Sequence, residues 1–222
     1  MAISPARLLL GPILRHVGTT TAAMWVQTSR PAEVEVLGCR ASTFTVCDEH
    51  YALVDIDGLE PGSVIRIRCI WMQPGLAATG ITVAREPDPY PRHRDGSSGG
   101  FGSCRRARGD APRSMAIDGA DALDAYADRM AATGPEALPE ALLLLGDQVY
   151  ADDPAPQTRR WLDRHRDTTT PPGHEVADFT EYSRLYRDSW SDAPLRWLMS
   201  TVPTAMIFDD HDVRDDWNTS AA

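Results

Sequence analysis

Short stretches in which apolar and polar residues alternate fill the first third of the chain. They cover residues 21–27, 32–37, 43–47, 52–56 and 64–71. An alternation with a period of two predicts strands that bury one face. Between the last two stretches, Pro61 and Gly62 are typical of a tight turn. Closely spaced strands joined by turns are typical of an antiparallel β-sandwich.

The pattern changes after residue 86. Residues 87–100 are rich in Pro, Gly and Ser, which predicts a linker. Beyond the linker, the order of strand-like and helical stretches is typical of a parallel sheet with crossover helices. We expect strands at 102–104, 141–145 and 204–208, the last two fully buried, and helices at 118–130, 157–166 and 179–190. The chain therefore divides into a sandwich domain at 1–86, a linker at 87–100 and a second domain at 101–222.

Charge and composition exclude several classes of partner. The chain has 222 residues, a net charge of −10 and a pI of about 5.0, the wrong sign for a protein that binds the nucleic-acid backbone. It contains no lysine, which excludes a Schiff-base lysine and the lysine of a phosphate-binding P-loop. The apolar runs are shorter than the roughly 18 residues of a membrane span. We expect no nucleic-acid surface and no membrane partner.

Cysteine spacing and the amino terminus predict the compartment. The four cysteines show no C-x-x-C spacing, so they predict neither a zinc knuckle nor a disulfide scaffold. Gly11 and Pro12 interrupt the apolar stretch near the amino terminus, and we identify no signal peptide. The prediction is a cytoplasmic protein with reduced thiols.

Two of the predicted strands end in acidic residues. Asp147 follows the strand at 141–145, and Asp209 and Asp210 follow the strand at 204–208. Ligands of open α/β sheets bind at the carboxyl ends of strands, and several carboxylates at one edge need a cation. Tyr150 and Cys104 can add a phenolate and a thiolate, donors that favour a trivalent or transition ion beside calcium or magnesium. The sequence therefore predicts a mixed metal site.

Three segments carry these residues. They are F-G-S-C-R at 101–105, G-D-Q-V-Y at 146–150, and D-D-H-D-V at 209–213 with W-N at 217–218. In content and order they resemble the PhoD-like alkaline phosphatases and phosphodiesterases, relatives of the calcineurin-like and purple acid metallophosphatases. L-E-P-G at 59–62, with the strand after it, resembles the fibronectin-III-like module that many PhoD-like proteins carry at the amino terminus.

The resemblance implies roles for the metal ligands. Asp147 would bridge two metals, and Tyr150 and Cys104 would be ligands of the iron. Asp209 and Asp210 stand where related metallophosphatases have a glycine and an asparagine ligand, so either would contact metal. The implied cofactors are divalent and trivalent metal ions, namely Fe³⁺ with Ca²⁺.

The resemblance also implies how the phosphoryl group is handled. His211 would contact that group or protonate the leaving oxygen, with Asp212 as its partner. Arg105, and Arg106 beside it, are candidates for holding phosphate, because guanidinium groups match phosphate geometry.

The fold class expected from these features is a two-domain α+β/α/β chain. A fibronectin-III-like β-sandwich is followed by the first half of an αββα metallophosphatase domain. The family completes both metal positions with histidines from its later half, which residues 101–222 do not supply. We therefore expect an incomplete chain that exposes a strand edge and an apolar sheet face, and that associates through this half-sheet.

The predicted function is that of a metal-dependent phosphoester hydrolase, a phosphomonoesterase or phosphodiesterase that uses metal-activated hydroxide on a small-molecule substrate. The alternative is a catalytically inactive or half-site binding module that needs a partner or a carboxy-terminal half. A metallohydrolase of carboxylic esters or amides is a third hypothesis, which no nucleophile elbow or H-E-x-x-H motif supports.

Overall fold

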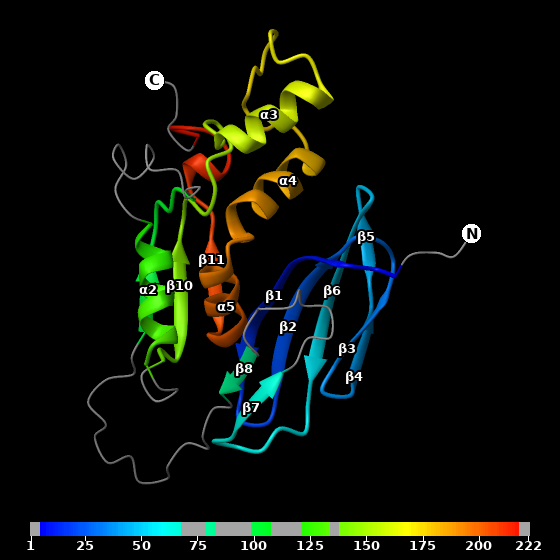
Figure 1. The fold of residues 1–222 in the computed structure, drawn as a ribbon, viewed down its shortest axis with the longest axis vertical. Coiled ribbons are helices and arrows are strands. Elements are labelled where there is room, and N and C mark those ends of the chain that lie inside the picture. The colour runs from blue at the N-terminus through cyan, green and yellow to red at the C-terminus, as the bar shows by residue number, and fades with distance from the viewer. Residues whose placement is uncertain (1–4, 68–78, 83–98, 108–120, 134–137, 218–222) are drawn as a thin grey trace.

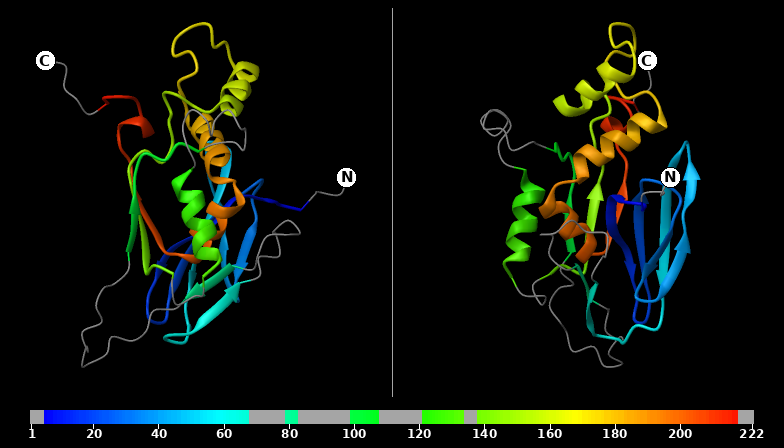
Figure 2. Two further views of the ribbon diagram at one scale, coloured as in Figure 1. Left: turned by 60° about the vertical axis from the view of Figure 1, so that its left-hand side comes forward. Right: turned by 45° about the vertical axis from the view of Figure 1, so that its right-hand side comes forward.

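The computed structural model describes residues 5–67, 79–82, 99–107, 121–133 and 138–217. Antiparallel strands make up the amino-terminal part of this region, and helices with a short parallel sheet make up the carboxy-terminal part (Figure 1). The two parts lie side by side, as both views of Figure 2 show. Together they form an α+β fold.

The amino-terminal part contains a four-stranded antiparallel sheet in the order β1-β2-β6-β5 and two antiparallel strand pairs, β3 with β4 and β7 with β8. The strands are β1 Leu8–Val17, β2 Ala22–Thr28, β3 Glu33–Val36, β4 Cys39–Ser42, β5 Phe44–Val46, β6 Glu49–Ile56, β7 Val64–Ile67 and β8 Thr79–Thr82. The strands predicted at 21–27, 32–37, 43–47 and 52–56 are confirmed. The strand predicted at 64–71 is confirmed as far as Ile67, and its remainder lies outside the described residues.

Two strands of this part escape the alternation rule. Five consecutive residues in the middle of β1 are buried, so β1 shows no period of two. β4 has only four residues, none of them a large apolar one. In β3, by contrast, Val34 and Val36 are buried while Glu33 and Glu35 are exposed, which is the pattern of a strand with one face in a core.

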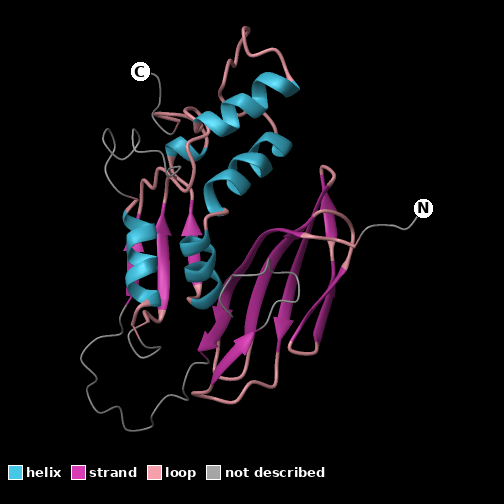
Figure 3. Cartoon of the chain, viewed as in Figure 1, coloured by secondary structure: helices cyan, strands magenta, loops and turns pink. Residues whose placement is uncertain are grey.

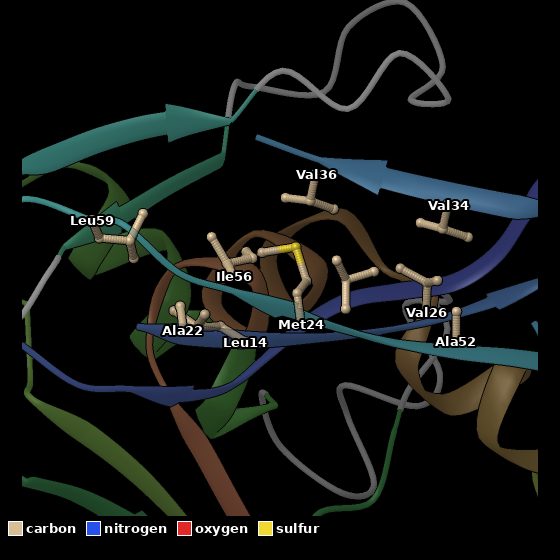
Figure 4. Close-up of a cluster of buried hydrophobic side chains, with 10 residues drawn as sticks. Leu14, Ala22, Met24, Val26, Val34, Val36, Ala52, Ile56 and Leu59 are labelled. Carbon is tan, nitrogen blue, oxygen red and sulfur yellow. The ribbon is translucent and has the colours of Figure 1, made fainter. Parts of the chain in front are cut away.

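The four-stranded sheet buries one face under β3. Figure 4 shows the resulting core, in which apolar side chains of β1, β2, β3 and β6 interdigitate. Leu14, Met24 and Val54 have exposed fractions of 0%. Gly11 shapes the edge of this sheet, because it has a φ of 90° and a Cβ at this position would lie 2.9 Å from the carbonyl oxygen of Trp25.

The carboxy-terminal part is built on three parallel strands in the order β11-β10-β9. The strands are β9 Gly99–Gly102, β10 Ala141–Leu145 and β11 Thr204–Ile207, and the helices are α2 Ala122–Ala131, α3 Pro156–His165, α4 Phe179–Trp190 and α5 Ala193–Thr201 (Figure 3). The helices predicted at 157–166 and 179–190 are confirmed. The helix predicted at 118–130 is observed from Ala122, and the residues before Asp121 lie outside the described part.

Aspartate caps fix where three of these helices begin. The side chains of Asp121, Asp178 and Asp192 accept hydrogen bonds from backbone N–H groups in the first turns of α2, α4 and α5. Such caps satisfy donors that have no partner within the helix. None of the helices in the described ranges is long and apolar enough to cross a membrane.

Among the described residues, the parallel sheet is covered on one face only. Leu142 and Leu144 of β10 are buried against α2 and α5. Leu143 and Leu145 point to the opposite face, where they are 42% and 44% exposed. Phe101 and Ile207 pair with them in register and are 79% and 61% exposed.

The helices lie on one side of the parallel sheet in Figure 2, and no described element covers the other side. The prediction of fully buried strands at 141–145 and 204–208 is therefore wrong for the residues on that face, although the strands themselves are confirmed. The predicted strand at 102–104 is displaced, because β9 ends at Gly102. Of the predicted linker, residues 87–98 lie outside the described residues, and Gly99 and Gly100 belong to β9.

The second face of the four-stranded sheet packs against the helices. Leu10 and Ile13 of β1 share a core with Trp190 of α4 and with Leu195 and Met199 of α5. Polar contacts join β6 of the same sheet to α4. The Tyr51 hydroxyl lies 2.8 Å from Ser183 Oγ, and Glu49 Oε2 accepts from Gln27 Nε2 and Arg187 Nη1 at 2.8 and 2.9 Å.

Candidate metal centre

The predicted acidic residues lie in the loops where β10 and β11 end. After β10, Gly146 has a φ of 102° and Asp147 a φ of 48°. A Cβ added to Gly146 would lie 2.5 Å from the Cβ of Asp209, in the loop after β11. Glycine at this position therefore allows the two loops to approach each other closely.

Asp212 holds these two loops together. It ends the short 3₁₀ helix η2 (Asp210–Asp212) and is 5% exposed. Its Oδ1 accepts hydrogen bonds from the N–H groups of Gln148 and Val149 at 2.9 and 3.1 Å, and its Oδ2 accepts from that of Asp209 at 3.0 Å. Burial raises the pKa of Asp212 despite these hydrogen bonds. The prediction that Asp212 is the partner of His211 is wrong, because backbone donors occupy both of its oxygens.

Asp147, Asp210 and His211 form a group that could hold a metal ion. One ligand atom from each lies within 4.8 Å of the others. Asp147 is 5% exposed, and its buried Oδ1 has no hydrogen-bond partner. A buried carboxylate oxygen without a donor is costly unless a cation or another donor compensates it. The residues present therefore fit a metal ion.

Cys104 and Tyr150 border this group. The Cys104 N–H donates to the carbonyl oxygen of Gly146 at 3.3 Å, and Cys104 has a φ of 56°. A hydrogen bond with Ser103 lowers the pKa of the Cys104 thiol, but Asp147 and partial burial raise it, and the net direction is upward. Burial first, and then the charge of Asp147, raise the pKa of Tyr150. A nearby cation would act in the opposite sense and favour thiolate and phenolate.

The side chain of His211 is fixed by two neighbours. Its Nδ1 lies 2.8 Å from Asp152 Oδ2, and its ring centroid lies 4.6 Å from that of Tyr150. Partial burial favours the neutral ring, but the hydrogen bond and charge of Asp152, with the charges of Asp147 and Asp210, raise the pKa of His211.

Asp210 lies at the exposed side of the group. Its Oδ1 accepts from the His211 N–H at 3.1 Å, and its Oδ2 accepts from the Asp216 N–H at 3.0 Å. The hydrogen bond from Asp216 is the largest effect that lowers the pKa of Asp210. Asp210 is thus held as an anion beside the buried Asp147.

Arg105 contacts carboxylates at the starts of α2 and α5. Its Nη2 lies 2.9, 3.3 and 3.0 Å from carboxylate oxygens of Asp121, Asp124 and Asp192, and its Nη1 donates to the Ser189 carbonyl at 2.6 Å. The side chain is only 10% exposed. Arg105 thus ties the starts of α2 and α5 together and also lines a cavity of about 380 Å³, so its substrate-binding role stays a prediction.

Arg106 contacts the ring of Tyr150. Its guanidinium carbon lies 4.8 Å from the centroid of the Tyr150 ring, and it pairs with Asp153. The cavity of about 380 Å³ opens beside it and is lined by Cys104, Arg105, Arg106, Gly146 and Gln148 among others. Cavities of this size hold small molecules.

The structure brings together the predicted residues Cys104, Asp147, Tyr150, Asp209, Asp210 and His211. Sequence reasoning gave no role to one further residue, Asp152. Asp152 follows Tyr150 by two residues, but nothing in the local pattern indicates a pair with a histidine 59 positions later.

Comparisons with known proteins bear on the family and the fold of this chain. A family model described as a PhoD-like phosphatase matches residues 119–222, and one described as a domain of unknown function (DUF7800) matches residues 5–68. A solved structure titled "Structure of PhoD" is similar with a TM-score of 0.60 and 17% identity over 98% of this chain, and this likeness concerns the fold. The chain spans 41% of the length of that protein. No curated protein matches the chain. Residues 119–222, just under half of the chain, are therefore similar to PhoD-like phosphatases, and the fold of the chain is similar to that of PhoD.

Proposed function

We propose that this chain carries a metal-dependent phosphoester hydrolase site at the ends of β10 and β11. The observation that supports it most directly is the buried Asp147, whose Oδ1 has no hydrogen-bond partner and whose neighbours Asp210 and His211 offer further ligand atoms. The match of residues 119–222 to PhoD-like phosphatases supports phosphoester hydrolysis as the reaction.

The ligand set we propose has two kinds of donor. Asp147 would bridge two ions, with Cys104 and Tyr150 on the side of an Fe³⁺ ion. Asp209 and Asp210 would serve a Ca²⁺ ion, because hard divalent cations prefer carboxylate oxygen. Bound metal ions would polarise the phosphoryl oxygens and lower the pKa of the water that attacks.

The side chains around this position supply binding and proton transfer. His211 would contact the phosphoryl group or protonate the leaving oxygen, which requires a protonated ring, and the negative groups around it raise its pKa in that direction. Arg106 joins Arg105 as a proposed phosphate contact, because both line the cavity and Arg106 also lies over Tyr150. The cavity of about 380 Å³ fits a small-molecule phosphoester.

We also propose the finer architecture that these features indicate. Residues 1–86 would be a fibronectin-III-like sandwich, and residues 101–222 the first half of an αββα metallophosphatase domain, in a cytoplasmic protein. The exposed Phe101, Leu143, Leu145 and Ile207 support association through the open sheet face.

The test of the function is hydrolysis of nitrophenyl phosphate and bis-nitrophenyl phosphate by the full chain supplied with iron and calcium. Asp147→Ala should lose bound metal and activity, and His211→Ala should lower kcat by about 100-fold or more. Asp128→Ala, a change at an exposed position of α2, is the control and should leave both unchanged.

Equal rates in the wild type and in both site variants would contradict the proposal. Metal binding by the wild type without any hydrolysis would instead support a half-site binding module. Circular dichroism of each variant verifies that it folds.

A further inference from the structure

A second cavity, of about 660 Å³, lies between the four-stranded sheet and α4, and we call it the sheet–helix cavity. None of the described residues that line it belongs to the candidate metal centre. A cavity of this size holds a small organic molecule. It is therefore a separate candidate for a binding site.

Aromatic side chains line the sheet–helix cavity from both sides. On the sheet, the rings of Trp25 and Tyr51 stack with their centroids 5.5 Å apart, and the ring of Phe44 lies 5.8 Å from that of Tyr51. Residues spaced three and four positions apart share one face of a helix, and such a face of α4 forms the opposite side. It consists of Phe179, Tyr182, Ser183, Tyr186 and Trp190. Rings arranged in this way favour a ligand with an apolar body.

Arg15 of β1 is the one charged side chain among the described residues that line the cavity. No described residue forms a hydrogen bond or an ion pair with its side chain, and burial lowers the pKa of its guanidinium group. An arginine stays protonated in proteins. A positive charge that is partly removed from water and has no counter-ion is costly, so an anionic ligand group would compensate it.

The other polar side chains beside the cavity already have partners. Gln27 Nε2 donates to Glu49 Oε2 at 2.8 Å, and the Tyr51 hydroxyl lies 2.8 Å from Ser183 Oγ. The carboxylate of Glu49 is paired with Arg187 at 2.9 Å. These contacts leave Arg15 as the position for a polar ligand group, which favours a ligand with a single charged head.

The strand order indicates the shape of such a ligand. Arg15 lies on β1 and Phe44 and Val46 lie on β5, the two edge strands of the sheet. Three strand spacings place these edges about 14 Å apart. Phe44 and Val46 are 52% and 38% exposed, so solvent reaches the apolar end of the cavity. A ligand that spans the cavity is therefore elongated.

We propose that the sheet–helix cavity binds an elongated organic anion, with one negatively charged head at Arg15 and an apolar body against the aromatic side chains of the sheet and α4. The proposal is independent of the phosphoester hydrolase site. A neutral or cationic ligand of the same shape would leave Arg15 without a counter-ion and should bind more weakly.

The first experiment compares three probes that share one apolar chain and differ in charge. Decanoate, 1-decanol and decyltrimethylammonium are titrated into the full chain below the concentrations at which they aggregate. Calorimetry measures affinity, and tryptophan fluorescence reports on the cavity because Trp25 and Trp190 line it. Decanoate should bind about 10-fold or more tightly than either other probe, because its carboxylate forms a charge-assisted hydrogen bond with Arg15.

The second experiment locates the bound probe with substitutions. Arg15→Met keeps an unbranched side chain without the charge, so it should lower decanoate affinity by about 10-fold and leave decanol affinity unchanged. Val46→Trp fills the accessible end of the cavity and should weaken both probes. Arg40→Met, at an exposed arginine of β4, and Leu143→Ala, on the open face of the parallel sheet, are the matched controls and should change neither affinity.

Several results would overturn the proposal. They are the absence of decanoate binding, equal affinity for the three probes, and an unchanged decanoate affinity in Arg15→Met. The comparison of probes on the wild type decides the question even if Arg15→Met does not fold. Weaker binding in Leu143→Ala but not in Val46→Trp would place the probe on the open sheet face. A wild-type dimer that Val46→Trp dissociates would identify a second copy of the chain as the occupant.

Discussion

The two sheets of this molecule are built from similarly apolar strands but differ in what covers them. The four-stranded sheet is covered by β3 on one face and by α4 and α5 on the other. The parallel sheet is covered by α2 and α5 on one face, and its other face is open within the described residues. β10 reads Ala-Leu-Leu-Leu-Leu, so its buried and exposed positions are equally apolar.

The difference shows that strand sequence and strand environment can disagree. In β3 the exposed positions are glutamates and the buried ones valines, so sequence and burial agree. In β10 the exposed positions are leucines, which is the composition of a parallel strand buried on both faces. The sequence of β10 therefore predicts that the open face is buried, and no described residue packs on it.

A pair of substitutions at adjacent residues of β10 tests most directly whether the two faces of the parallel sheet differ in packing. Leu144→Ala opens a cavity against α2 and α5 and should cost about 2–5 kcal/mol of unfolding free energy. Leu143→Ala, one residue away on the open face, should cost about 1 kcal/mol or less because little packing is lost. Urea unfolding of both variants measures the difference. Equal losses would mean that Leu143 is covered in solution.

Two glycine substitutions should differ in their cost to stability by an intermediate amount. Gly146→Ala places a Cβ 2.5 Å from that of Asp209 at a φ of 102°, so it should cost about 2–3 kcal/mol and weaken metal binding. Gly38→Ala, in the β3–β4 hairpin, has a φ of 86° but no atom within 4 Å of the added Cβ. It should cost about 1 kcal/mol, from backbone strain alone. Thermal unfolding and bound metal are the readouts, and an undisturbed Gly146→Ala would refute the close approach of the two loops.

Local pattern was sufficient for most of the fold. The sequences of β2, β3 and β6 show a period of two, and those of α3 and α4 show helical periodicity. These patterns could be recognised because each element buries one face. β1 could not be found this way because it is buried on both faces, a property set by the distant α4 and α5. For the same reason the degree of burial of β10 and β11 could not be predicted, because burial depends on what packs on a strand.

The candidate site, like the fold, could be predicted from the sequence only in part. The ends of β10 and β11 were found from acidic residues that directly follow apolar runs. The contact partners of the side chains could not be predicted in this way. Arg105 and Asp152 contact residues 16 to 87 positions away in the sequence, and these contacts depend on how the loops and helices pack. Because Asp212 directly follows His211 in the sequence, it was the expected partner of the histidine. The capping geometry of η2 instead turns Asp212 toward backbone donors.

The smallest expected effect concerns charge buried beside the parallel sheet. Asp121, Asp124 and Asp192 surround the single cation of Arg105. Burial, and then the hydrogen bond and charge of Asp192, raise the pKa of Asp124 to about 7. In the β3–β4 strand pair, by contrast, the ion pairs of Arg40 with Glu33 and Glu35 are exposed and should contribute little.

Asp124→Asn tests this contrast through pH. The folded state holds the Asp124 proton up to about pH 7, whereas the unfolded state releases it near pH 4, so wild-type stability from this group falls as pH rises between these values. The asparagine has no proton to lose. After discounting for partial exposure, the variant should gain roughly 1 kcal/mol at pH 8, or about 2–4 °C in Tm, and nothing at acidic pH below the carboxyl's ordinary pKa. Asp128→Asn, on the exposed side of the same helix, should show no such pH dependence. If Asp124→Asn instead destabilises the protein at pH 8, Asp124 is ionised there and its pairing with Arg105 outweighs the repulsion from Asp192.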